Sequence, residues 1–179
     1  MRGALAAATL ALAALAASGS PPALAKASDG TVMRRTTLLV HDIEKSIRFY
    51  EILGFSVWLN GPWGAVRAGG LPVQGVKPGD PNRLVLMKGK DPYLGMVGLL
   101  QQGKVQKAPK FSLRRGDPIL MIEITDMAGV ERKLRAAGFT IHKAPETSHI
   151  KSVSDEWDAK FMFAIDPDGH MLELTERLN

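Results

Sequence analysis

The 179-residue sequence contains no cysteine. Disulfide bonds are therefore excluded, and so is the lipid-anchored type of signal cleavage, which requires a cysteine. Aromatic residues make up only 6% of the chain, and no apolar run reaches the roughly 20 residues with which a helix crosses a bilayer. The sequence also shows no nucleophile–base motif, no phosphate-binding glycine loop and no dinucleotide fingerprint. Several common classes of enzyme are thus not indicated.

The N-terminal residues differ in composition from the remainder of the chain. Arg2 is followed by an alanine- and leucine-rich run from Ala4 to Ala17, and the small-residue pattern Ala23-Leu24-Ala25 comes next. This order is typical of a secretory signal peptide. We expect a signal peptide over residues 1–27 and a mature periplasmic or secreted protein over 28–179, with no membrane attachment after cleavage. An uncleaved N-terminal anchor or an alanine-rich tail is the alternative.

Charge and hydropathy indicate an ordinary globular domain. Hydrophobic residues make up 45% of the chain, which is enough to bury a core without metals or crosslinks. The formal charge is +5, and loss of Arg2 and Lys26 with the leader leaves 21 basic and 18 acidic residues, or +3. Basic residues are densest around residues 103–117, where Phe111 is the one aromatic residue. A solvated linker is therefore expected there, and nucleic-acid binding is not.

Two segments resemble each other at an offset of 84 residues: TTLLVHDIEKSIRFYEILGF (36–55) and LMIEITDMAGVERKLRAAGF (120–139). In each, an apolar strand-like run ends at an aspartate, Asp42 or Asp126, which can cap a helix N-terminus. Apolar residues then recur every three or four positions, and Gly54 or Gly138 supplies the left-handed residue that ends a helix. The repeat predicts two strand–helix units of the same design.

Further strand candidates follow each unit, so each half is predicted as β-α-β-β-β, an α+β fold. The candidates are residues 55–59, 83–88, 96–101, 139–143, 160–165 and 170–175. The predicted single domain has module one at 33–102, a linker at 103–117 and module two at 118–176.

Between residues 60 and 82 lies a Gly- and Pro-rich loop, in which Trp63 is a candidate lid over a ligand. A surface insertion without function is the alternative. In the turn DPDG (166–169), Asp166 and Asp168 are expected to bond local amides as turn formers.

The repeat, the helix SIRFYEILGF and the closing DPDGHMLEL together resemble the vicinal oxygen chelate superfamily over roughly Met33 to Glu176. That group includes glyoxalases, extradiol dioxygenases, fosfomycin-resistance transferases and bleomycin-binding proteins. The resemblance implies that each module forms a half-barrel and that the two half-barrels together form a cup. It also implies, in metal-dependent members, His or Gln ligands on the first strand and Glu on the last strand of each module. Dimerisation through module edges is common in the family, so a homodimer is one expectation.

Carried over to this sequence, the family's first-strand ligand positions fall on Arg35 and Ile119, which cannot replace His or Gln. The last-strand positions fall near Gly98 and on Glu173, so only Glu173 matches. A divalent metal normally needs about three or four protein donors. We therefore expect no metal cofactor. A rebuilt site that uses His149 or His142 with Glu173 is the alternative.

Strand alternation predicts which side chains face the cup. The predicted ligand-binding cavity collects Arg35, Thr37, Met121, Glu123 and Glu173. We expect Arg35 to occupy the space of the missing metal, to pair with Glu173 or Glu123, and to orient an anionic or carbonyl-bearing ligand. A purely structural ion pair is the alternative.

Three functions remain at this stage. The favoured one is an exported, metal-free protein that holds a small molecule in its cup, which needs only an apolar cavity with a few convergent polar groups. A metal-dependent glyoxalase-like lyase or extradiol-type dioxygenase would use the metal as a Lewis acid. A non-catalytic interaction module is the third. The sequence identifies no catalytic residue and leaves open whether the protein is an enzyme.

Overall fold

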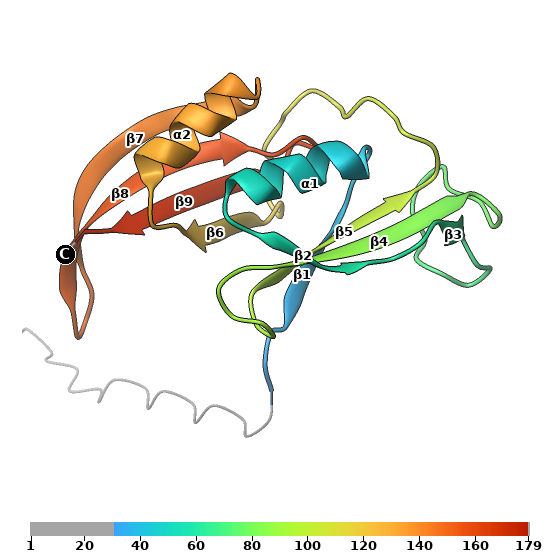
Figure 1. The fold of residues 1–179 in the computed structure, drawn as a ribbon, viewed down its shortest axis with the longest axis horizontal. Helices are drawn as coiled ribbons and strands as arrows, with labels where there is room; N and C mark the ends of the chain where they lie inside the picture. Colours follow the sequence, from blue (N-terminus) through green and yellow to red (C-terminus); the bar gives the residue numbers. More distant parts are fainter. Residues whose placement is uncertain (1–30, 179) are drawn as a thin grey trace, which may run out of the picture. The chain divides into compact units, whose positions relative to one another are not determined.

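A computed structural model describes residues 31–178 of the chain (Figure 1). The predicted signal peptide lies outside the described residues. One sheet contains β1 (Arg35–Leu39), β2 (Ser56–Asn60), β3 (Gly64–Ala65), β4 (Pro81–Lys88) and β5 (Met96–Gln102). The other contains β6 (Ile119–Glu123), β7 (Thr140–Lys151), β8 (Glu156–Ile165) and β9 (Met171–Arg177). The helices are α1 (Ile43–Ile52) and α2 (Met127–Ala136).

The two sheets have the same topology. Their strand orders are β1-β5-β4-β2 and β6-β9-β8-β7, and the short β3 pairs with β4 beside the first path. In each sheet the first and last strands of the module are parallel neighbours, whereas the other pairs are antiparallel. The prediction of an α+β fold built from two β-α-β-β-β modules is confirmed.

Both helices begin and end where the sequence predicts. Asp42 caps α1 by accepting a hydrogen bond from the Lys45 N–H at 3.2 Å, and Asp126 caps α2 through the Gly129 N–H at 2.8 Å. Gly54 and Gly138 follow the helices with φ values of 97° and 73°. Only glycine adopts this region without strain, so the chain can reverse there into the next strand.

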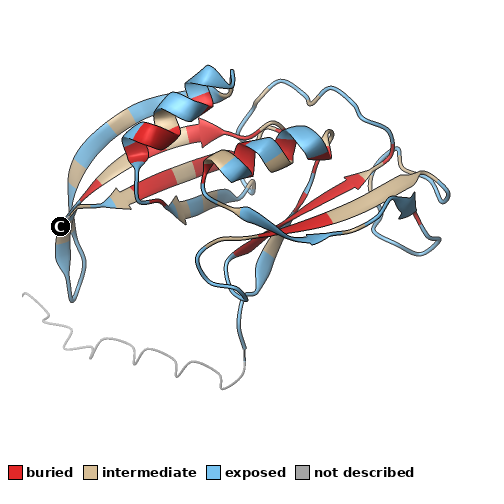
Figure 2. Cartoon of the chain, in the orientation of Figure 1, coloured by how far each residue is buried: buried red, intermediate tan, exposed pale blue. Residues whose placement is uncertain are grey.

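The hydrophobic core lies between the helices and one face of each sheet. The helical residues Ile43, Phe49 and Leu134 are at most 1% exposed, and strand residues of both modules, including Leu99, Met162 and Leu172, complete one cluster. Figure 2 shows this buried layer beneath the two helices. Phe49 meets Tyr50 and Phe139 edge to face, with ring centroids 5.3 and 5.1 Å apart, which joins the first helix to module two. The two modules thus share a core.

The opposite face of the first strands is open to solvent. Leu38 and Val40 point into the core, whereas Leu39 between them is 45% exposed. Ile119 and Met121 of β6 are 50% and 66% exposed, while Ile124 is buried. This alternation agrees with the predicted orientation of both strands, and it leaves an apolar surface on the face away from the helices.

Two strands are longer than predicted. β7 extends from Thr140 to Lys151 and β8 starts at Glu156, so most of the expected loop KAPETSHIKSVSDEWDAK is a hairpin. Its outer half is largely exposed on both faces, so no apolar alternation marks it as a strand. Among residues 31–178, neither helix has the length and apolar character needed to span a membrane.

Candidate functional site

The side chains predicted to form a cavity lie on the first and last strands of the two modules. Strand register places Thr37 beside Gly98 in module one and Met121 beside Glu173 in module two. Arg35, Thr37, Met121 and Glu123 are exposed, and Glu173 is half-buried. Of the four ligand positions carried over from the family, Arg35, Ile119, Gly98 and Glu173, only Glu173 has a carboxylate.

The last-strand position of module one has no room for a ligand side chain. A Cβ added at Gly98 would lie 2.8 Å from Thr37 Oγ1 and 3.3 Å from Leu86 Cδ2. The first distance is shorter than carbon–oxygen packing allows, so Thr37 and Leu86 occupy the space that a glutamate would need. Glycine at this position is explained by the close approach of its neighbours.

Arg35 does not form the ion pair expected from the sequence. The ion pairs formed within residues 31–178 include none that joins Arg35 to Glu173 or Glu123. The expectation treated the inward face as one closed cup, but Arg35 and Glu123 are exposed on edge strands of two different sheets. The hypothesis that an arginine–glutamate pair fills the metal position is therefore corrected.

Arg35 instead lines a cavity of about 370 Å³ between the two first strands. We call this cavity the Arg35 pocket. Arg35 and Met121 are the two predicted site residues in it, and its other walls are mostly apolar: Met33, Phe55, Met96, Val97, Pro118, Ile119, Leu120 and Ile122. The structure thus brings two of the five predicted residues to one pocket.

The residues at and beside the family's expected ligand positions do not form a donor set for a divalent metal. Thr37 supplies a neutral hydroxyl, Met121 a thioether, Gly98 no side chain and Arg35 a cation. No group of three or more His, Cys, Asp or Glu within residues 31–178 is arranged to hold a metal ion. His149 bonds Asp158 at 2.8 Å on the outer hairpin, and the His142 ring lies 6.0 Å from that of Phe111. The metal chemistry that the family resemblance implies therefore has no set of ligands among these residues.

The candidate lid residue packs against its own module. The Arg83 guanidinium carbon lies 5.5 Å from the centre of the Trp63 ring, and Arg83 also bonds Asn60 and Glu44. A cation above an aromatic face at this distance is attracted to it. Whether Trp63 covers a ligand stays a prediction.

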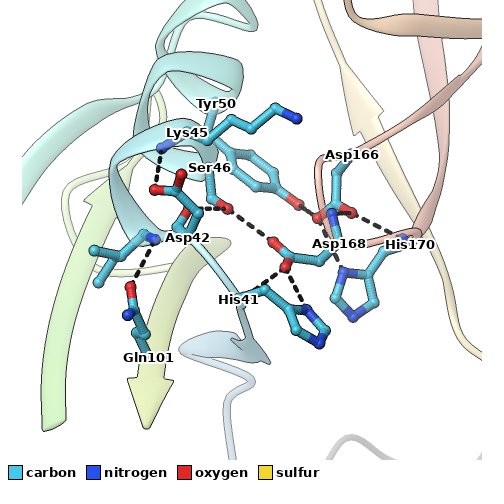
Figure 3. Close-up of polar contacts among 10 residues, drawn as sticks. His41, Asp42, Lys45, Ser46, Tyr50, Gln101, Asp166, Asp168 and His170 are labelled. Atoms are coloured by element: carbon cyan, nitrogen blue, oxygen red, sulfur yellow. Dashed lines mark hydrogen bonds and ion pairs between the residues drawn. The ribbon is translucent and has the colours of Figure 1, made fainter. Parts of the chain in front are cut away.

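A buried polar cluster joins the two modules, and the sequence did not predict it (Figure 3). Asp168 Oδ1 accepts a hydrogen bond from the His41 backbone N–H at 2.6 Å and lies 2.9 Å from His41 Nδ1. Asp168 Oδ2 accepts a hydrogen bond from Ser46 Oγ at 2.8 Å. The Asp168 side chain is 2% exposed. The turn formed by residues 166–169 in module two is thereby tied to the start of α1 in module one.

Asp166, the first acid of this turn, combines two roles. Its Oδ1 accepts from the backbone N–H groups of Asp168 and His170 at 2.9 and 2.8 Å, as expected of a turn former. Its Oδ2 accepts from Tyr50 Oη at 3.1 Å and lies 2.9 Å from His170 Nδ1. The turn-former prediction is thus confirmed for Asp166. It is incomplete for Asp168, whose side chain bonds the other module and not its own turn.

The pKa values of two groups in the cluster reflect this burial. Burial raises the pKa of Tyr50 well above its ordinary value, and the charge and hydrogen bond of Asp166 raise it further. For His170, burial lowers the pKa, but the hydrogen bond and charge of Asp166 and the charges of Asp168 and Asp117 outweigh it, so the pKa is raised. Tyr50 and His170 therefore each hold their proton to a higher pH than the free side chain does.

The linker between the modules lies over this cluster and forms two further cavities. One, of 380 Å³, lies between residues 36–39 of β1, residues 109–114 of the linker and residues 168–171. We call it the junction pocket. The other, of 520 Å³, is lined by His41, Lys45 and residues 105–109 on the far side of the turn. The sequence indicated only a solvated linker, because nothing in its composition shows what it packs against.

With this geometry described, the chain can be compared with known proteins. The family model for the glyoxalase/bleomycin resistance protein/dioxygenase superfamily matches residues 32–174. The chain belongs to this superfamily. Comparison with curated proteins gives no match.

Solved structures of this family share the fold at low identity. A glyoxalase family protein from Bacillus cereus has a TM-score of 0.57 and 18% identity, over 88% of this chain and 100% of that one. The trypanothione-dependent glyoxalase I of Leishmania major has a TM-score of 0.52 and 20% identity, over 82% of this chain and 86% of that one. A domain from Frankia sp., described as glyoxylase/bleomycin resistance protein/dioxygenase, has a TM-score of 0.55 and 16% identity, over 83% and 98%. These similarities support the fold. They do not identify a ligand, which has to be inferred from the residues of this chain.

Proposed function

We propose that this protein, exported by its N-terminal signal peptide, binds a small molecule in the Arg35 pocket without a divalent metal. One observation carries the proposal: a mostly apolar cavity of 370 Å³ with the Arg35 side chain in its wall. Small-molecule sites are usually apolar cavities with a few polar groups that orient the ligand. A guanidinium presents a planar fork of donors that suits a carboxylate or a carbonyl oxygen.

The position of the pocket also supports the proposal. It lies between β1 and β6, the first strands of the two modules, so both modules contribute to it. Ile119 and Met121, at 50% and 66% exposure, provide apolar surface that a ligand would cover. A second copy of the chain could cover the same surface, so we include a homodimer in the proposal, and size-exclusion chromatography with light scattering measures it.

The test is native mass spectrometry together with elemental analysis of protein purified from the periplasm. The proposal requires an organic adduct and less than one metal ion per chain. Arg35→Ala is expected to lose the adduct. Arg34→Ala is the matched control, because Arg34 is the neighbouring arginine and its guanidinium carbon lies 5.9 Å from the Tyr93 ring centre and not in the pocket.

Three outcomes would contradict the proposal. One zinc, iron or manganese ion per chain would favour the metal-dependent lyase or dioxygenase. Equal retention of the adduct by the Arg35→Ala and Arg34→Ala variants would show that the ligand is held elsewhere. A chain without an adduct, combined with a stable complex with another protein, would favour the interaction module.

A further inference from the structure

The junction pocket contains a histidine whose two ring nitrogens have different surroundings. His170 Nδ1 lies 2.9 Å from Asp166 Oδ2, and the Asp166 side chain is 0% exposed. No hydrogen bond formed within residues 31–178 uses His170 Nε2. The His170 side chain is 26% exposed and belongs to the wall of the pocket. The buried carboxylate therefore fixes the ring orientation, and the second nitrogen is left to meet a ligand.

The charged groups around His170 make it a hydrogen-bond donor. Asp166, Asp168 and Asp117 all raise its pKa, against the opposite effect of burial. Each of these acids already has other partners: Asp166 bonds Tyr50, Asp168 bonds His41, and Asp117 bonds Arg114. A protonated His170 with Nδ1 committed to Asp166 carries a second N–H at Nε2.

The rest of the pocket adds positive charge and apolar surface. Lys110 and Arg114 of the linker line it from the solvent side, and both are exposed. Phe111 is half-buried, and Leu113 is 47% exposed. Pro109, Pro118 and Met171 complete an apolar wall. A carboxylate would suit the cationic groups, and a ring or short aliphatic chain would suit this wall.

We propose that the junction pocket binds a small organic carboxylate, which accepts a hydrogen bond from His170 Nε2 and packs its apolar part against Phe111 and Leu113. The site shares Thr36 and Pro118 with the wall of the Arg35 pocket, but that pocket contains neither His170 nor the linker residues 109–114, which make the proposed contacts. The proposal therefore stands whether or not the Arg35 pocket has a ligand.

Binding at this site depends on pH in a defined direction. The carboxylate stabilises the protonated form of His170, so affinity is highest at low pH and falls as pH rises through the raised pKa of His170. A neutral amide of the same shape lacks the charge and binds more weakly at low pH.

Benzoate is a suitable probe, and benzamide is its neutral counterpart. Each is titrated into the ¹⁵N-labelled full chain, and backbone amide shifts are followed at about pH 6 and about pH 9. We expect benzoate to shift the amides of Phe111, Gly169 and Met171, with an affinity at least about tenfold lower at the higher pH, as loss of a charge-assisted hydrogen bond implies. Benzamide is expected to bind more weakly than benzoate at the lower pH.

His170→Asn is the informative variant, because the asparagine Nδ2 can replace His170 Nδ1 as the donor to Asp166 while Nε2 is lost. It is expected to weaken benzoate binding at least about tenfold. His149→Asn is the matched control, since His149 also contacts carboxylates but lies on the outer β7–β8 hairpin. This variant is expected to bind as the wild type does. Phe111→Ala, in the exposed linker, tests the apolar contact if His170→Asn does not fold.

The results that would overturn the proposal are specific. They are an absence of shifts with millimolar benzoate, shifts confined to residues of the Arg35 pocket, or equal affinities of wild type and His170→Asn. Equal affinities at both pH values would also reject the role of His170. Unchanged binding to Phe111→Ala would reject the proposed packing of the ligand against Phe111.

Discussion

Asp168 and His41 lie 127 residues apart in the sequence but are in direct contact. The Asp168 carboxylate accepts a hydrogen bond from the His41 backbone N–H at 2.6 Å and lies 2.9 Å from His41 Nδ1. Ser46 Oγ donates to the second oxygen of the same carboxylate at 2.8 Å. Since Asp168 Oδ1 and Oδ2 are both used, this one side chain satisfies three donors of module one. Loss of this carboxylate should therefore lower the stability of the protein.

Asp168→Ala is expected to lower the free energy of unfolding by about 2–4 kcal/mol. The reason is that the half-buried His41 backbone N–H would lose its acceptor, and the buried Ser46 hydroxyl would lose the shorter of its two contacts and keep only the Asp42 carbonyl oxygen at 3.1 Å. Urea denaturation followed by circular dichroism measures the change. The matched control is Asp91→Ala in the Asp-Pro turn of module one, where Asp91 bonds only the nearby Tyr93 and Leu94 amides on the surface. A loss for Asp168→Ala no larger than that of Asp91→Ala would contradict the importance of the inter-module contact.

His170 predicts how stability varies with pH. Its pKa in the native protein is raised above the unfolded value of about 6.5, so the native state binds more protons between the two values. The stabilisation by protonated His170 is fully present below the unfolded pKa and is lost as pH rises through the native pKa. The difference in unfolding free energy between wild type and His170→Asn should therefore shrink from about pH 6 upward. If the difference in unfolding free energy between the two proteins instead grew with pH, the pKa of His170 would not be raised in the native state.

Tyr50 predicts a delayed phenol titration. Burial, followed by the charge and hydrogen bond of Asp166, raises the pKa of Tyr50 well above its ordinary value of about 10. The chain has two tyrosines, so Tyr93→Phe leaves Tyr50 as the one phenol. Phenolate absorbance of this variant should appear only when the protein unfolds in alkali. Absorbance that appears near pH 10 with native circular dichroism would show that Tyr50 is accessible.

Gly98 predicts a steric effect at the cup. Gly98→Ala places a Cβ 2.8 Å from Thr37 Oγ1, and the resulting overpacking is expected to cost about 1–3 kcal/mol of stability. Thr37→Ala removes that oxygen, so the double variant should recover part of the loss. A double-mutant cycle in urea measures the coupling. Additive effects would show that the strand shifts to accommodate the methyl group and that Thr37 does not restrict the position.

The fold could be predicted because its signals are local and repeated. Asp42 and Asp126 mark helix starts, Gly54 and Gly138 mark helix ends, and apolar residues at two spacings distinguish helices from strands. The structure confirms each of these. The outer half of the β7–β8 hairpin was missed because it is exposed on both faces, and a strand without a buried face has no alternating pattern.

The site was harder to predict because it depends on how the two modules meet. Alternation correctly placed Arg35 and Met121 on the face away from the core, but it could not determine which residues of the other sheet lie opposite. The ion pair between Arg35 and Glu173 or Glu123 was therefore an incorrect expectation. The contacts of Asp168 with His41 and Ser46 leave no local signal either, since the same DPDG motif also makes an ordinary turn.

The position of the 166–170 turn has a consequence for the order in which the chain becomes native. His41, Ser46 and Tyr50 are synthesised early, but their buried acceptors belong to the last 14 residues of a 179-residue chain. A nascent chain that stops before Asp166 would hold a first helix whose polar groups face an incomplete interior. Module one is therefore expected to mature only when residues 166–170 have emerged, and ribosome-stalled chains should resist protease only after that point.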